Sequence, residues 1–179
     1  MRMRGMVLAL TLAIGSFALT NPAHAQGTPA QALASPIGKV MSVLGTVTVE
    51  RANASAVQAN AAPGQPVKEG DLVYRGDVIL TGPDSKVSLV FADGTAFNVS
   101  NTARMELNEF VYNPNGKSNS SVFSLLRGTF TFVAGKIAKT GSMTLDTPAA
   151  TMGIRGTTPH VVVSEDGSVR FSTLIEEKR

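Results

Sequence analysis

The residue types that carry most enzyme chemistry are scarce in this sequence of 179 residues. It contains no cysteine, which excludes a thiol nucleophile and a cysteine-ligated metal. His24 falls in an N-terminal segment that we expect to be removed, so His160 is the one imidazole of the mature chain. Because a metal site needs three or four ligands, this lone histidine beside Pro159 predicts a structural or surface position.

The serines and carboxylates do not form a catalytic pattern. Neither a G-x-S-x-G nor an S-x-x-K motif occurs. Most aspartates accompany glycine in turn-forming sequence, and no calcium-loop motif is present; they are Asp71, Asp77, Asp84, Asp93 and Asp166. We therefore expect no catalytic residue, no metal and no cofactor, and we predict a non-enzymatic protein. The enzyme alternative is a hydrolase with a dispersed pair of carboxylates, which a sequence alone does not reveal.

Residues 1–25 predict a cleavable secretory signal. Arg2 and Arg4 open it, the run 5–19 is almost wholly apolar, and Ala23-His24-Ala25 matches the small-x-small cleavage pattern. The apolar run is shorter than the ~20 residues that a helix needs to cross a bilayer. We expect cleavage after Ala25, a periplasmic or secreted protein, and no membrane span in the mature chain.

The charge argues against nucleic acid as a partner. The formal charge of +3 includes the two arginines of the signal, so the mature chain carries about +1. Its basic residues are interleaved with acidic and apolar ones, whereas binding to phosphates needs a concentrated basic surface. Without disulfides, the exported fold must depend on core burial, which is feasible for about 150 residues.

β-branched and alternating apolar residues predict strands along residues 38–173. The polar segment 26–37 predicts a flexible leader, 52–62 a loop with a short extended piece, and 174–179 a charged tail. About ten to thirteen short antiparallel strands, separated by turns every eight to twelve residues, predict a single all-β domain of the sandwich or roll type.

Glycine-containing turns divide these strands. Asp93-Gly94 lies between alternating apolar residues and predicts a hairpin with a positive φ at Gly94. Arg127-Gly128 predicts a turn between two strands, and Glu165-Asp166-Gly167 predicts a second hairpin. Residues 113–121 predict a polar loop.

Three segments rich in glycine and aspartate stand out. They are GQPVKEGDLVYRGDVILTG at 64–82, DSKVSLVFADGTAFNVS at 84–100, and DTPAATMGIRGT at 146–157. In this order and spacing they resemble the FecR protein domain, the extracytoplasmic all-β domain of the ferric-citrate regulator family. The resemblance covers about residues 38–173.

We expect the motif residues to be mainly structural. They are Gly70, Asp71, Gly76, Asp77, Thr81, Gly82, Asp93, Gly94, Thr147, Pro148, Arg155, Gly156 and Thr157. Pro148 cannot donate to a strand ladder and predicts a strand end or an edge. Arg155 follows the small apolar stretch 149–154, which predicts a buried or half-buried guanidinium that pins the end of the sheet to nearby loops. Its alternative role is in a recognition surface.

The resemblance implies a regulator in the bacterial envelope. Members of the family combine a cytoplasmic segment that acts on a sigma factor, one membrane helix, and this periplasmic domain, which senses an outer-membrane transporter. In this sequence a cleavable signal takes the place of the first two parts, so we expect no direct control of a sigma factor.

We therefore predict an exported signalling module that binds an envelope protein. An exposed strand edge, or loops such as 113–121, would make the contact. The alternative is a cell-wall or polysaccharide-binding module. That alternative is weakened because Tyr74 and Tyr112, with no tryptophan, are the candidate aromatic platforms for sugars.

Overall fold

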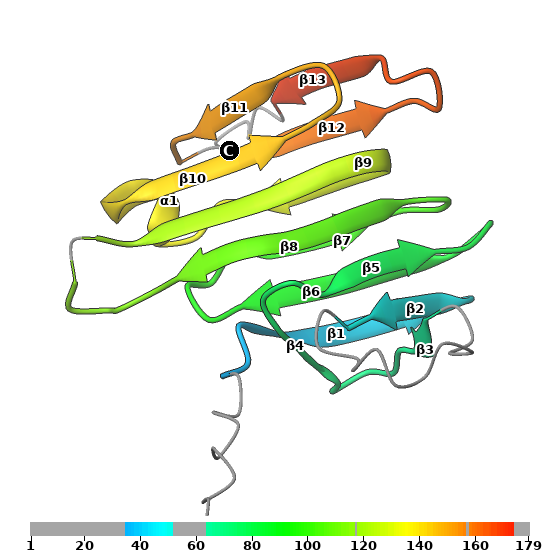
Figure 1. Cartoon of the computed structure of the whole chain (residues 1–179), viewed down its shortest axis with the longest axis horizontal. Coiled ribbons are helices and arrows are strands. Elements are labelled where there is room, and N and C mark those ends of the chain that lie inside the picture. Colours follow the sequence, from blue (N-terminus) through cyan, green and yellow to red (C-terminus); the bar gives the residue numbers. More distant parts are fainter. Residues whose placement is uncertain (1–34, 52–63, 117, 157, 174–179) are drawn as a thin grey trace, which may run out of the picture. The chain divides into compact units, whose positions relative to one another are not determined.

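The alternating residues form thirteen strands and one short helix within residues 35–51, 64–116, 118–156 and 158–173, which the computed structural model describes (Figure 1). The predicted all-β fold is confirmed. The predicted signal 1–25, most of the leader 26–37, the loop 52–62 and the tail 174–179 lie outside the described residues.

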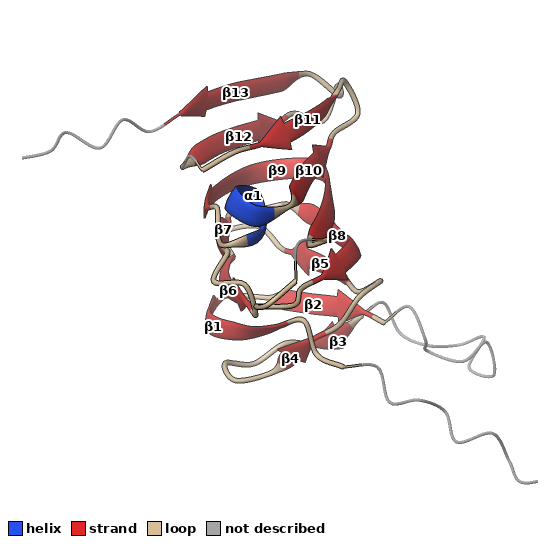
Figure 2. Ribbon diagram, turned by 90° about the vertical axis from the view of Figure 1, so that its left-hand side faces the viewer, coloured by secondary structure: helices blue, strands red, loops and turns tan. Residues whose placement is uncertain are grey.

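The strands form two layers, seen side by side in Figure 2. Layer A contains, in spatial order, β4 (Leu72–Val73), β1 (Gly38–Leu44), β6 (Lys86–Phe91), β7 (Ala96–Val99), the second half of β9 (Ser120–Val133), β12 (Pro159–Val163) and β13 (Val169–Thr173). Layer B contains β3 (Gln65–Pro66), β2 (Val47–Glu50), β5 (Val78–Thr81), β8 (Arg104–Val111), the first half of β9, β10 (Ser142–Asp146) and β11 (Thr151–Ile154).

Strand β9 belongs to both layers. Its first half pairs with β8 and β10, and its second half pairs with β7 and β12. The predicted turn at Arg127-Gly128 is therefore wrong. Gly128 has a φ of 108° and bends one continuous strand, because this left-handed conformation redirects the chain without ending it.

Pairing is antiparallel throughout the described residues with one exception. β9 and β10 run parallel, with Ser142 opposite Ser120 and Asp146 opposite Ser124. The chain reaches β10 from the end of β9 through a connection that contains α1 (Ile137–Thr140). The prediction of antiparallel strands did not include this crossover.

Aromatic rings from both layers meet in one core. Phe91 and Phe97 of layer A lie with their ring centroids 4.9 and 5.1 Å from that of Phe123 of layer B. Phe97 also stacks on Phe132 at 4.5 Å. Such pairs add about 0.5–1.5 kcal/mol beyond the burial of their area, so they join the two layers directly.

Two predicted loop segments contain buried residues. Ile37, at the end of the predicted leader, is buried, and its N–H donates to the Val73 carbonyl. Asn119 closes the loop 113–121 from inside: its Oδ1 accepts from Asn113 N at 2.8 Å, and its Nδ2 donates to Thr140 at 3.2 Å. Ser120 and Ser121, assigned to that loop from the sequence, belong to β9.

Candidate interaction site

The first predicted motif residues form two copies of one turn. In Lys68–Asp71 and in Tyr74–Asp77, a glycine with positive φ precedes an aspartate. The aspartate carboxylate accepts a hydrogen bond from the backbone N–H three residues earlier. The distance from nitrogen to oxygen is 2.8 Å for Asp71 and 2.9 Å for Asp77. Gly70 and Gly76 supply the left-handed conformation that such turns require.

Asp77 is buried, and its partner is Arg51. The Arg51 guanidinium contacts the Asp77 carboxylate at 2.6 Å and lies 5.0 Å from the centre of the Tyr74 ring. Burial raises the pKa of Asp77 above its usual value of 3.8, although the Tyr74 N–H and Arg51 favour the ionised form. This ion pair ties the end of β2 to the turn before β5.

Thr81 and Gly82 hold the far end of β5. The Thr81 hydroxyl donates to the Ser100 carbonyl at 2.6 Å and accepts from Ala103 N at 2.8 Å. Gly82 N donates to the Thr46 carbonyl, which connects the layers at a corner. The Thr81 hydroxyl and the backbone groups bonded at this corner are thus hydrogen-bonded, as buried polar groups require.

Asp93 does more than shape the β6–β7 hairpin, which is confirmed together with the positive φ of Gly94. The Asp93 carboxylate is buried and accepts from Thr95 N, from the Thr95 hydroxyl and from Ile137 N, at 2.9, 2.8 and 3.2 Å. It therefore attaches the hairpin to the start of α1.

The third motif lies in and after the β10–β11 hairpin. The Thr147 hydroxyl donates to the Ala150 carbonyl at 2.8 Å, and Pro148 lies in the turn, as predicted for a strand end. Arg155 is exposed, which contradicts the predicted burial, because β11 ends at Ile154 and Arg155 lies beyond the paired strand. Gly156 has a φ of 59°, whereas Thr157 and the cleavage residue Ala25 lie outside the described residues.

These motif residues do not converge on one site. They occupy turns at several places in the two layers, and their contacts are hydrogen bonds that join strands. Among the residues that the structure describes, no three His, Asp or Glu side chains gather as a metal-ligand group. A binding site must therefore be sought on the edges and faces of the layers.

Four strands of the described region have a neighbour on one side only: β3, β4, β11 and β13. β3 and β4 have two residues each, and β3 contains Pro66. β11 has four residues, including Gly153. Short strands and proline are common means of protecting an edge from pairing, which leaves β13, with five residues, as the most open edge.

The register shows which backbone groups of β13 face outward. Ser164 N donates to the Ser168 carbonyl at 2.9 Å, so this pair begins the hydrogen-bonded ladder of the β12–β13 hairpin. Because bonded and non-bonded pairs alternate in antiparallel strands, Val169, Phe171 and Thr173 direct their N–H and C=O groups away from β12.

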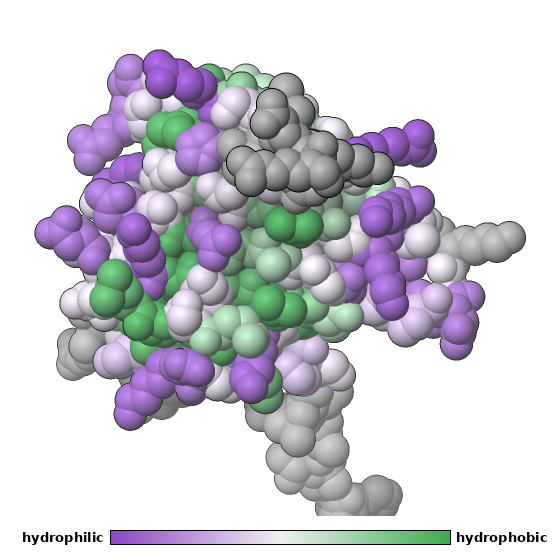
Figure 3. Space-filling model, turned by 180° about the vertical axis from the view of Figure 1, so that it is seen from behind, coloured by the Kyte–Doolittle hydropathy of each residue, from purple (hydrophilic) through white to green (hydrophobic). Residues whose placement is uncertain are grey.

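The same three residues direct their side chains toward the inner face of layer A. Phe171 is opposite Val161, which is fully buried, yet Phe171 itself is 41% exposed. Other large apolar side chains of the described residues also reach the surface, among them Leu44 and Val133, and Figure 3 shows apolar groups between hydrophilic ones on one face. At β13, an apolar inner face therefore coincides with backbone groups that have no partner strand among the described residues.

The sequence reasoning proposed a strand edge but did not identify Phe171. The alternation in Val169–Thr173 was visible as a strand pattern. That β13 is the last strand of its layer depends on the pairing order, which the pattern does not contain.

Comparison with known families adds the decisive finding. The family model described as FecR protein matches residues 77–175, more than half of the chain. The chain belongs to the FecR protein family. The match begins at Asp77 and runs through β13, so it includes the open edge. No curated protein and no solved structure matches the chain.

Family membership makes this a module related to regulation and signalling, and FecR domains are periplasmic in their family context. Within residues 35–51, 64–116, 118–156 and 158–173, no helix is long and apolar enough to span a membrane.

Proposed function

We propose that this protein is an exported, non-enzymatic FecR module that signals by binding an envelope protein at the β13 edge. The observation that carries the proposal is the unpaired backbone of Val169, Phe171 and Thr173, beside the exposed Phe171 ring. A partner strand added there would gain main-chain hydrogen bonds and cover an apolar side chain.

The register defines the chemistry of that partner strand. Residues placed opposite Val169 and Phe171 would face the apolar core and should be apolar, whereas residues placed opposite Arg170 would face outward and should be polar or acidic. The expected ligand is an extended segment with this alternation.

The test uses proline at an outward-facing N–H. Thr173→Pro removes one donor of the free edge but none of the bonds to β12, so the fold should tolerate it. The envelope partner is first captured by crosslinking to the wild-type protein and then purified. Its affinity should fall at least about tenfold for Thr173→Pro and stay unchanged for Thr173→Ala.

Two results would overturn this function. One is a partner that binds Thr173→Pro as tightly as wild type while circular dichroism shows both to be folded. The other is turnover of a substrate by the purified protein, which would contradict the non-enzymatic role. Export is tested separately, by mass spectrometry of the mature N-terminus, which should begin at Gln26.

A further inference from the structure

The outer face of layer A carries an unbroken row of polar side chains. Cross-strand register places six residues side by side, one on each of β1, β6, β7, β9, β12 and β13. They are Ser42, Ser88, Asn98, Thr131, His160 and Ser172. With strands about 4.8 Å apart, the row extends roughly 24 Å across the layer.

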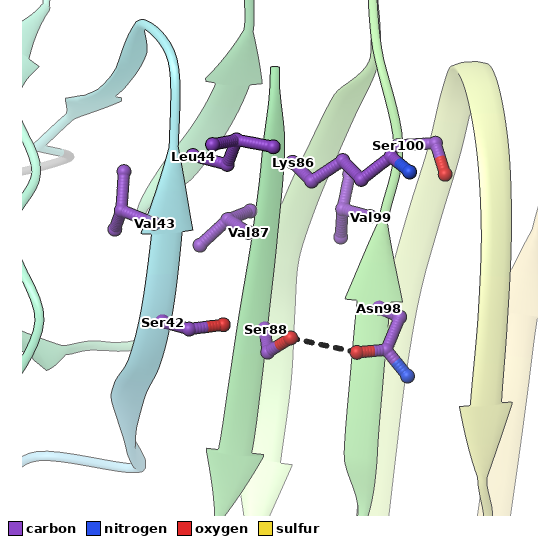
Figure 4. Close-up of a pocket in the computed structure, with 9 residues that line it drawn as sticks. All are labelled: Ser42, Val43, Leu44, Lys86, Val87, Ser88, Asn98, Val99 and Ser100. Carbon is purple, nitrogen blue, oxygen red and sulfur yellow. Dashed lines mark hydrogen bonds between the residues drawn. The ribbon is translucent and has the colours of Figure 1, made fainter. Parts of the chain in front are cut away.

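Hydrogen bonds between neighbours order parts of this row. The Ser88 hydroxyl donates to Asn98 Oδ1 at 2.7 Å, and the Thr131 hydroxyl and His160 Nδ1 are 2.8 Å apart. Figure 4 shows Ser42, Ser88 and Asn98 aligned across three strands, with the bond between the last two. The side chains are thus held on one surface before any ligand arrives.

A depression of about 420 Å³ lies at one end of the row. Ser42, Ser88 and Asn98 line it. Leu44 and Lys86, which lie opposite each other on β1 and β6 beside the row, also line it. In Figure 4 the Lys86 side chain extends across β7 toward Ser100. The depression therefore combines hydroxyl and amide groups, one cation and an exposed aliphatic side chain.

The two outer faces differ in their acidic residues, and layer B carries both signs of charge, since Arg104 of β8 pairs with Glu50 and Glu106 at 3.4 Å. The strands of layer A contain Lys39, Lys86 and Arg170 but no Asp or Glu. The outward acids of layer B lie on β2, β8 and β10: Glu50, Glu106, Glu109 and Asp146. Near layer A, acids occur in the turns at strand ends, as at Asp84 and Asp166. The outer face of layer A thus favours an anionic ligand.

We propose that this face binds an acidic polysaccharide, whose chain lies along the polar row. Sugar hydroxyls both donate and accept, and so do serine, threonine and asparagine side chains. Lys86 and Arg170, which flank the row on one side, pair with carboxylates of the polymer. Lys39, Val90, Ala96 and Val133 flank it on the other side, and the three apolar members contact the C–H faces of sugar rings.

The small, regularly spaced hydroxyl and amide groups of the row favour a polysaccharide over a protein partner, although this face lacks the aromatic platforms on which sugar rings often stack. None of the outward positions described above in β1, β6, β7, β12 and β13 is Phe, Tyr or Trp. Protein interfaces depend on buried aromatic or arginine anchors set in pockets. A flat row of small polar groups lacks such anchors but matches a polymer with regularly repeated hydroxyls.

The experiment measures binding of the full exported chain to polygalacturonate by isothermal titration calorimetry. Neutral dextran and polyglutamate are the comparison polymers. Wild type should bind polygalacturonate more tightly than either, with an affinity that falls as salt rises. The double variant Lys86→Gln/Arg170→Gln should weaken binding about tenfold.

The matched control is Lys136→Gln/Lys139→Gln. It also removes two positive charges, but at α1, which packs beside β10 of layer B. It should bind polygalacturonate as wild type does, and so should Thr173→Pro. The proposal is overturned if wild type does not bind polygalacturonate, if polyglutamate binds equally well, or if the control loses as much affinity as the test variant.

Discussion

Gly128 is the residue on which the joining of the two layers depends. Its φ of 108° is strained for any residue with a side chain. A Cβ atom at this position would also overlap Ala103, whose Cα would be 2.6 Å away. Backbone conformation and packing therefore both require glycine where β9 passes from layer B to layer A.

Gly128→Ala should lower the free energy of unfolding by about 3 kcal/mol, the sum of left-handed strain and overpacking. Urea denaturation measures the loss. The control is Gly153→Ala in β11, where an added Cβ meets no atom within 4 Å. If the two variants are equally stable, the bend does not need glycine.

Asp77 should make stability depend on pH. Because burial raises its pKa in the fold, the folded chain binds this proton more tightly than the unfolded chain does. The stability contributed by Asp77 is therefore largest below pH 3.8 and falls as pH rises through the folded pKa. Asp77→Asn retains a side-chain oxygen for Tyr74 N and Arg51 but does not titrate.

The measurement is urea denaturation of wild type and Asp77→Asn from pH 3 to pH 7. The advantage of wild type over the variant should shrink as pH rises above about 4 and then level off. An advantage that grows with pH would show instead that the attraction of Arg51 outweighs burial.

At the scale of elements, one carboxylate connects the β6–β7 hairpin to α1. Asp93 accepts three hydrogen bonds, and one of these comes from Ile137, at the start of a helix of four residues. So short a helix is not stable by itself, because nucleation is costly and few bonds follow. Its position depends on this contact and on burial of Ile137 and Ala138.

Asp93→Ala should cost about 3 kcal/mol of unfolding free energy, since buried donors lose a charged acceptor. Hydrogen exchange at the Ile137 amide should accelerate. Asp166→Ala is the control: it too precedes a glycine in a hairpin, but its carboxylate is exposed and accepts from Ser168 N. A loss as large at Asp166 would contradict the special role of Asp93.

The two glycine turns show how far local sequence predicts elements. Asp93-Gly94 was predicted as a hairpin because the signal lies within a few residues and the strands on both sides alternate. Arg127-Gly128 was read as a turn, although the structure has a bend. Both Gly94 and Gly128 have a positive φ. They differ in packing, because Gly128 lies against Ala103, which is distant in sequence, whereas a Cβ at Gly94 would meet no atom within 4 Å.

At the scale of the whole described region, β9 makes the layers interdependent. Every pairing of its first half belongs to layer B, and every pairing of its second half belongs to layer A. The core contains phenylalanine rings from both layers. Loss of either layer would expose the inner face of the other, so partial unfolding is unfavourable.

The protein should therefore unfold in one transition. Urea midpoints from far-UV circular dichroism and from tyrosine fluorescence, which reports on Tyr74 and Tyr112, should coincide. Two separated midpoints would show that the layers unfold independently.

The sequence alone determined the fold class, the family and turns such as Asp93-Gly94, because alternation and glycine placement act over a few neighbouring residues. It did not reveal that Lys39, Lys86 and Arg170 share a face without acids, or that Phe171 lies at an open edge. Along the chain, these residues are separated by many others. Strand order decides which side chains become neighbours, and that order arises from packing of the two layers around one core.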